Sequence, residues 1–468
     1  MKTNIVTYYM LVFLLISLPS CREKTKQENN QISLLKVSKE NPRYFADQKG
    51  NIVYLTGSHT WANLVDISTD DPPKPFDFNA YLDWMQKYNH NFIRLWAMEV
   101  MNWKSERYNP GKSYTVYPHP WKRTGPGNAI DGKAKFNLNE FEEEYFNRLR
   151  NRIETASKRG IYISVMLFEG WGMQFSLDGW KNHPFHPDNN INGINADLNR
   201  DGNGLELYDL SVPEVTDIQK KYISHVIDMV NEFDNVLYEI SNENHPPSTQ
   251  WQYLLINFIH DYEKNKPKQH PVGMTFQYKG GSNDTLLASP AEWISPNPFF
   301  NGKDLRNDPP AADGKKVILY DTDHLWGLGG NQPWVWKTFT RGMYPLFMDP
   351  YDGVFIGDPN TRGYEQIRKN MGYARMYAGK IDLAQTIPAN ELTSTTYCLA
   401  NPGSEYIVYQ PLPDSSFTVN LKKGRYSFEW FNPGSGIVES TGKVRVRGEN
   451  TLFKAPFSGD AVLYLKAF

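Results

Sequence analysis

Residues 236–245 read VLYEISNENH, and this stretch decides the fold. Its first six residues form a largely apolar run of strand length, which stops at Asn242 and Glu243. A strand that is apolar on both faces is typical of a parallel sheet covered on both sides. In parallel barrels the reactive groups lie at the carboxyl ends of the strands, so an acid directly after such a run is a candidate for chemistry.

The same unit, an apolar run followed by an amphipathic helical pattern, recurs along the chain. Seven further runs occupy residues 52–56, 92–97, 161–168, 272–276, 293–295, 317–320 and 345–348. Helical patterns occupy residues 78–88, 138–159, 215–232, 249–263, 333–341 and 360–378. Eight strands that alternate with helices over residues 32–384 predict an α/β fold, a (β/α)8 TIM barrel. A doubly wound sheet is the alternative, but it would place a Gly-rich turn after the first strand, where residues 57–61 read GSHTW.

The pattern changes at about residue 385. Six strand-length runs follow, at residues 397–400, 406–409, 416–421, 424–431, 442–447 and 461–465. Turn sequences such as Asn-Pro-Gly, at residues 401–403 and 432–434, separate them. This pattern predicts a small C-terminal β-sandwich domain over residues 385–468.

The N-terminus is typical of export. Lys2 precedes an apolar run at residues 10–18 that is too short to span a bilayer as a helix. Residues 18–21 read LPSC and resemble the lipobox of bacterial lipoproteins, which implies a signal peptide at residues 1–20 and lipidation of Cys21. Polar residues 21–31 would form a tether. We therefore expect a protein anchored by lipid in the bacterial cell envelope, at the outer membrane; a plain signal peptide with an incidental cysteine is the alternative.

Composition excludes some classes of partner. The chain of 468 residues has a net charge of −2 with its Lys and Arg residues dispersed, so nothing points to nucleic acid. Aromatic residues make up 14%, including 13 Trp and 28 Tyr. Aromatic faces stack on sugar rings, although a large aromatic core would give the same composition.

Two acids follow two of the predicted barrel strands. Glu243 follows the fourth run, and residues 320–326 after the seventh run read YDTDHLW, which contains Asp321 and Asp323. Glycoside hydrolysis needs two carboxyl groups, one to protonate the leaving oxygen and one to attack the anomeric carbon or activate water. We prefer Asp323 as the second group because it lies further beyond the strand, with Asp321 as its rival. The alternative for Glu243 is that it is a solvated acid in a loop. The alternative for Asp323 is a structural role, either capping a helix or pairing with Arg94.

The Asn242-Glu243 pair at the end of the fourth strand resembles clan A glycoside hydrolases. More narrowly, residues 41–45 (NPRYF) and 53–61 (VYLTGSHTW), with the C-terminal β-domain, resemble the apiosidase-like family, whose C-terminal module is named for collagen binding. The resemblance implies that Glu243 is the acid/base, that Asn242 holds a sugar hydroxyl, and that Arg94 supports a nucleophile at Asp323 in a retaining reaction. The clan normally has Glu as nucleophile, so the shorter Asp323 leaves retention and inversion both open. No His-Glu-x-x-His motif supports a collagenase.

Aromatic and polar residues at other strand ends are candidates for sugar contacts. Each has packing or loop structure as its alternative. The predicted substrate-binding residues are His59, Trp61, Arg94, Trp96, Glu169, Trp171, Asn242, His324 and Trp326.

One loop has a pattern suited to calcium. Asp197, Asn199 and Asp201 alternate before a glycine, as in an EF-hand loop, but position twelve is Tyr208. The loop is therefore a candidate structural calcium site, or an Asn/Asp/Gly turn without metal. Catalysis by two carboxyl groups requires no cofactor.

These observations predict a glycosidase that acts on a poly- or oligosaccharide. A non-catalytic glycan-binding lipoprotein on the same barrel is the alternative, and a peptidase or matrix-binding protein is a weaker one. The acid/base role makes a specific demand, since Glu243 must then have a pKa well above the usual value of about 4.3.

Overall fold

The computed structural model describes residues 32–448 and 450–468. The predicted signal peptide, the tether and Cys21 lie outside the described residues, so the export and lipid anchor stay predictions. Within the described part of the chain, no helix combines the length and the apolar character needed to cross a membrane.

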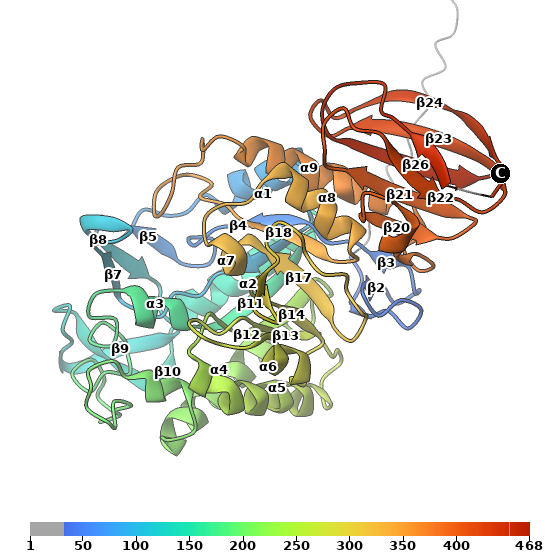
Figure 1. The fold of residues 1–468 in the computed structure, drawn as a ribbon. Coiled ribbons are helices and arrows are strands. Elements are labelled where there is room, and N and C mark those ends of the chain that lie inside the picture. The colour runs from blue at the N-terminus through green and yellow to red at the C-terminus, as the bar shows by residue number, and fades with distance from the viewer. Residues whose placement is uncertain (1–31, 449) are drawn as a thin grey trace, which may run out of the picture. The chain divides into compact units, whose positions relative to one another are not determined.

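Eight parallel strands form a barrel, as predicted (Figure 1). In sheet order they are β4 (Gly57–His59), β18 (Tyr344–Met348), β17 (Val317–Asp321), β14 (Trp293–Ser295), β13 (Val272–Thr275), β12 (Val236–Asn242), β11 (Tyr162–Glu169) and β6 (Phe92–Leu95). The backbone oxygen of Thr56 accepts hydrogen bonds from the amides of Asn91 (2.9 Å) and Phe92 (3.2 Å), which brings β4 and β6 together. A Cβ at Gly57 would lie 1.6 Å from the Phe92 oxygen, so this approach requires glycine.

The first strand differs from the prediction. Within the run at residues 52–56, Ile52–Val53 (β3) pairs instead with Phe45–Ala46 (β2) in a small antiparallel sheet that also contains Lys36–Val37 (β1). The barrel strand begins at Gly57, where the side-chain-free backbone fits against β6. Only the first two residues of the predicted run therefore form a strand, and that strand belongs to a different sheet from the barrel.

Helices lie outside the barrel strands in Figure 1. The six predicted helical patterns correspond to α1 (Phe78–Lys87), α2 (Glu143–Ser157), α4 (Pro213–Val230), α5 (Thr249–Glu263), α8 (Gln332–Thr340) and α9 (Tyr364–Ala378). Shorter helices follow strands at α3 (Gly170–Phe175), α6 (Asn283–Ala288) and α7 (Thr322–Trp326), and 3-10 turns occupy Leu205–Tyr208, Pro246–Ser248 and Asn390–Leu392. The six long helices could be predicted because each has an apolar face that repeats along the sequence. The short helices contain too few residues to show such a repeat.

Antiparallel strands that were not predicted are inserted into the barrel, mostly after β6. One sheet contains β5 (Asp66–Ser68), β7 (Asn102–Ser105) and β8 (Asn109–Tyr117); a hairpin contains β9 (Trp121–Asn128) and β10 (Ala134–Phe141), and a shorter one β15 (Phe299–Phe300) and β16 (Lys303–Asp304). β10 occupies the start of the helical pattern expected at residues 138–159. The two long strands β8 and β9 are mostly polar and contain glycine and proline, so no apolar pattern marks them in the sequence.

The C-terminal part is all-β and antiparallel, as predicted. Six strands form one sheet, in the order β19 (Ile387–Pro388), β20 (Cys398–Asn401), β21 (Glu405–Gln410), β26 (Ala461–Ala467), β23 (Gly424–Asn432) and β24 (Ile437–Val446). A second sheet pairs β22 (Phe417–Asn420) with β25 (Asn450–Phe453), and both sheets contribute to one core around Phe417, Trp430 and Phe453. A separate apolar cluster joins Trp336 of α8 to Phe431 of β23, so barrel helices and C-terminal strands share a core.

Candidate active site

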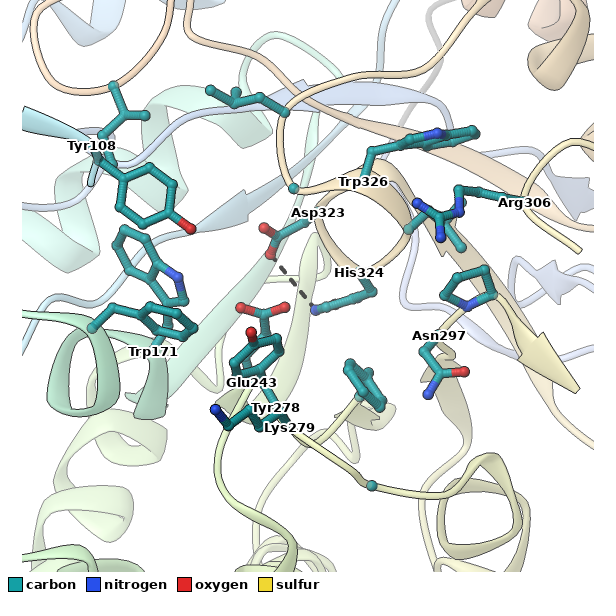
Figure 2. Close-up of a pocket in the computed structure, with 18 of the residues that line it drawn as sticks. Tyr108, Trp171, Glu243, Tyr278, Lys279, Asn297, Arg306, Asp323, His324 and Trp326 are labelled. Atoms are coloured by element: carbon teal, nitrogen blue, oxygen red, sulfur yellow. Dashed lines mark ion pairs between the residues drawn. The ribbon is translucent and has the colours of Figure 1, made fainter. Parts of the chain in front are cut away.

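A cavity of about 650 Å³ contains both preferred acids (Figure 2). Glu243 follows directly after β12, and Asp323 lies in the first turn of α7, directly after β17. Their carboxyl groups point toward one another in Figure 2. Aromatic side chains form much of the wall: Trp61, Trp96, Tyr108, Trp171, Phe175, Phe276, Tyr278, Phe299 and Trp326.

Glu243 sits in a strained conformation. Its φ is 44°, in the left-handed region that favours glycine and costs a branched or long residue roughly 1 kcal/mol. Gln174 of α3 donates a hydrogen bond of 2.8 Å from Nε2 to the Glu243 backbone oxygen and so fixes this turn. Only 8% of the residue is exposed. Strain of this kind persists where the surroundings hold the residue in place, as they often do in functional sites.

The two acids differ in their protonation. Burial raises the pKa of Glu243 well above its usual value of 4.5, and the negative charges of Asp323 and Glu169 raise it further. Burial also raises the pKa of Asp323, to about 6, although the Arg94 charge opposes this. The pair therefore keeps a proton on Glu243 at a pH where Asp323 has lost its own.

Arg94 organises the charges behind the cavity. It donates from Nε (2.9 Å) and Nη2 (2.6 Å) to the carboxylate of Glu239 in β12. Its Nη1 reaches Asp321 at 3.2 Å and Asp323 at 3.0 Å, and Nη2 also donates to the Oδ1 of Asn242. The carboxylates around this fully buried guanidinium raise its pKa, so Arg94 remains charged. Its charge-assisted hydrogen bond to Asp323 therefore holds that carboxyl group in place.

Asp321, the rival of Asp323, is placed differently. It is fully buried, does not line the cavity, and pairs with His59 Nε2 at 2.8 Å as well as with Arg94. Burial by itself would raise the pKa of Asp321, but His59 and Arg94 hold it below its ordinary range. Asp321 also accepts a hydrogen bond from the Asp323 amide (3.0 Å) as the N-cap of α7.

His324 links the pair to Asn242. Burial lowers the pKa of His324 well below 6.5, so its ring is neutral. Nε2 faces two acceptors, Asn242 Oδ1 at 3.1 Å and Asp323 Oδ2 at 3.6 Å, and therefore carries the proton, while Nδ1 accepts from the Ser295 hydroxyl at 2.7 Å. Because its Oδ1 accepts these bonds, Asn242 presents Nδ2 to the carboxyl group of Glu169.

The predicted sugar contacts divide into two groups. Trp61, Trp96, Trp171, His324 and Trp326 line the cavity, whereas His59, Arg94, Glu169 and Asn242 lie behind its wall. The carboxylate of Glu169 caps α3, accepting from the amides of Trp171 (2.7 Å) and Gly172 (2.6 Å), and burial raises its pKa. The binding roles of these residues stay predictions.

Other functional candidates were missed by the sequence analysis. Glu239 is a charged residue inside an apolar strand, a signal that a buried partner such as Arg94 must exist. Arg107, Tyr108, Lys279 and Arg306 line the cavity from loops, where no periodic pattern marks them.

The candidate calcium loop does bring its residues together. The side chain of Asp197 accepts from the amides of Asp201 and Gly202 (both 3.1 Å), and Asn199 Oδ1 accepts from the Asp201 amide at 2.8 Å. Within residues 32–448 and 450–468, no group of three or more His, Cys, Asp or Glu side chains is arranged to hold a metal ion. Calcium binding here stays a prediction.

Comparison with known proteins supports the architecture. The model of a family described as a domain of unknown function (DUF6298) matches residues 86–292, which include Glu243 but not Asp323. No curated protein matches the chain. A solved structure named glycoside hydrolase is 12% identical, with a TM-score of 0.60, and the match covers 93% of this chain and 97% of that one. A glycoside hydrolase family 5 protein from Bacteroides vulgatus ATCC 8482 is 13% identical, with a TM-score of 0.59 and 93% coverage of both chains. At such identities these likenesses establish the fold.

Proposed function

We propose that this protein is a retaining glycoside hydrolase in which Glu243 is the acid/base and Asp323 the nucleophile. One observation carries the proposal: two carboxyl groups face each other in a cavity lined with aromatic side chains, and their pKa values are shifted to different extents. The structurally similar proteins are named glycoside hydrolases, which supports the class of enzyme that is proposed.

The reaction follows from the protonation states. The Asp323 carboxylate attacks the anomeric carbon while Glu243 gives its proton to the leaving oxygen, so the glycosidic bond breaks as a glycosyl ester forms. Glu243, now ionised, removes a proton from water, which attacks the same carbon and releases the sugar and the Asp323 carboxylate. Arg94 holds Asp323 in place, and Asn242, buried behind the cavity wall, contacts both Arg94 and His324.

A panel of aryl glycosides and polysaccharides tests the activity, with wild-type protein compared with Glu243→Gln. We expect the variant to lose about 10²- to 10⁴-fold in kcat on substrates with a sugar leaving group, and less on dinitrophenyl glycosides, whose leaving group needs no proton. Asp261→Asn, on the exposed face of α5, is the control and should behave as wild type.

The stereochemistry needs a separate experiment. NMR of the freshly released sugar should show the anomeric configuration of the substrate, and a 2-fluoroglycoside should label the peptide that contains Asp323. An inverted product would assign Asp323 as a base that activates water. Saccharide binding without turnover by any substrate would favour the non-catalytic glycan-binding protein.

We also propose that the protein is exported and anchored by lipid at Cys21 in the outer membrane. The sequence LPSC at residues 18–21 supports this. Metabolic labelling with a fatty acid should mark the wild-type protein but not Cys21→Ser, and fractionation should recover only the wild type with the outer membrane. Equal labelling of both proteins would exclude the anchor.

A further inference from the structure

Three loops each bring one cation to the cavity. Arg107 comes from the turn between β7 and β8, Lys279 from the loop after β13, and Arg306 from the segment after β16. Apart from Glu243 and Asp323, these are the charged side chains among the described residues that line the cavity. The whole chain has 50 basic and 52 acidic residues, so this local excess of positive charge does not follow from composition.

Two of these cations lack a counter-charge. Arg107 and Lys279 are exposed and form no ion pair with any residue in the described part of the chain, although Arg107 packs over the Tyr108 ring at 5.1 Å. Arg306 pairs with Asp304, its Nη2 lying 2.7 Å from the carboxylate, and also packs near the Phe299 ring. A cluster of cations around a concave site raises the local concentration of anions and speeds their association.

The cations do not serve to balance the acid pair. Arg94 already contacts Asp323. After burial, the main influences on the pKa of Glu243 come from Asp323 and from residues behind the wall, and those on the pKa of Asp323 come from residues behind the wall. These residues behind the wall are His59, Arg94, Glu169 and Asp321. The three cations are not among these influences, so their positive charge does not set the protonation of the acid pair.

We propose that the cavity is built for an anionic saccharide, with Arg107, Lys279 and Arg306 binding carboxylate or sulfate groups on sugars next to the scissile bond. This inference rests on the proposed function and names its substrate class. Tyr108, Phe299 and Trp326, which line the same cavity, supply ring faces for the sugars that carry these groups. A neutral glycan would leave at least two unpaired cations without a role.

Binding to the Glu243→Gln protein, in which hydrolysis of oligosaccharides is greatly slowed, tests the inference without requiring turnover. Calorimetry would compare three probes of equal length: oligogalacturonides, which carry carboxylates; sulfated carrageenan oligosaccharides; and neutral manno-oligosaccharides. We expect one anionic series to bind at least about tenfold more tightly than the neutral series, and the preference to shrink as salt rises from about 0.01 M to about 0.15 M.

Added substitutions identify the groups responsible. Lys279→Met and Arg107→Met should each weaken binding of the anionic probe by about fivefold or more and leave neutral probes unaffected. Lys423→Met, at an exposed position between β22 and β23, is the matched control and should have no effect. Equal or tighter binding of the neutral probes, no binding of any anionic probe, or unchanged affinity in both variants would overturn the inference.

Failure of the inference and failure of the proposed function give different results. If the protein hydrolyses neutral substrates and shows no preference for charged ones, the inference of an anionic substrate is wrong, but the proposed glycosidase activity stands. Tight, salt-sensitive binding of an anionic probe that the wild-type protein never hydrolyses would keep the binding site and overturn the catalytic assignment.

Discussion

Two sets of carboxyl groups on β12 and β17, or directly after them, have different partners. In the ion cluster behind the cavity, Glu239 and Asp321 pair with Arg94 and His59. In the acid pair, Glu243 faces Asp323 and the open cavity. The pKa of Asp321 falls below its ordinary range, whereas that of Glu243 rises well above it. Burial raises both pKa values, but the cationic partners of Asp321 outweigh it, so of these two acids only Glu243 keeps a proton to donate.

The largest effect is expected from the nucleophile. Asp323→Asn removes the attacking carboxylate but keeps the shape of the side chain, so we expect kcat to fall by about 10³-fold or more. Because the oxygen of the substituted amide would still accept a hydrogen bond from Arg94, the melting temperature should change little. Steady-state kinetics and thermal melting measure both quantities. A variant with near wild-type activity would remove Asp323 from the mechanism.

Asp321→Asn tests the other side of the comparison. This change takes one charge from a fully buried ion cluster and leaves His59 and Arg94 undercompensated, so unfolding free energy should drop by about 3 kcal/mol. Denaturant titration measures the loss. Activity should fall less than in Asp323→Asn, because Asp321 acts only by positioning its neighbours. The opposite ranking, with full stability and a larger loss of activity, would make Asp321 the nucleophile.

The acid pair should govern the pH dependence of the rate. The rate is expected to rise through about pH 6 as Asp323 ionises, and to fall at higher pH as Glu243 loses its proton. A pH–rate profile without a basic limb would contradict the acid role of Glu243.

The same shift affects stability. The folded protein holds the Glu243 proton above pH 4.5, where the unfolded chain has lost it, so this group makes stability fall as pH rises from 4.5 toward the raised pKa. Glu243→Gln removes this dependence. Relative to wild type, the variant should gain at most about 1.4 kcal/mol per pH unit across that window. If the unfolding free energies of the two proteins changed in parallel with pH, the raised pKa of Glu243 would be contradicted.

The sequence predicted the framework and the acid pair, because both depend on buried strands. Seven barrel strands, six helices and six of the C-terminal strands followed from sequence patterns, and Glu243 followed from its place after β12. The sequence favoured Asp323 over Asp321 only because Asp323 lies further beyond the strand. In the structure the strand ends at Asp321 and a helix begins at Thr322, which turns Asp323 into the cavity.

The parts that were missed depend on contacts between distant segments. Gly57 begins the first barrel strand because Phe92 lies against it, a contact that local sequence does not contain. Arg107 and Arg306 reach the cavity through the inserted hairpins, whose polar strands have no apolar period. Loop residues are placed by the whole fold, so their shared position is visible only in three dimensions.

The smallest effect is expected at the candidate calcium loop. Asp197, Asn199 and Asp201 already satisfy loop amides through their side-chain oxygens, so the turn holds its shape through its own hydrogen bonds. These oxygens keep lone pairs that calcium can use, and binding to the folded state alone would stabilise it. We expect millimolar calcium to raise the melting temperature by about 1–2 °C over EDTA-treated protein, and Asp197→Asn to abolish the difference. A much larger drop on chelation would make calcium part of the fold, and identical melting curves would leave the loop as a turn without metal.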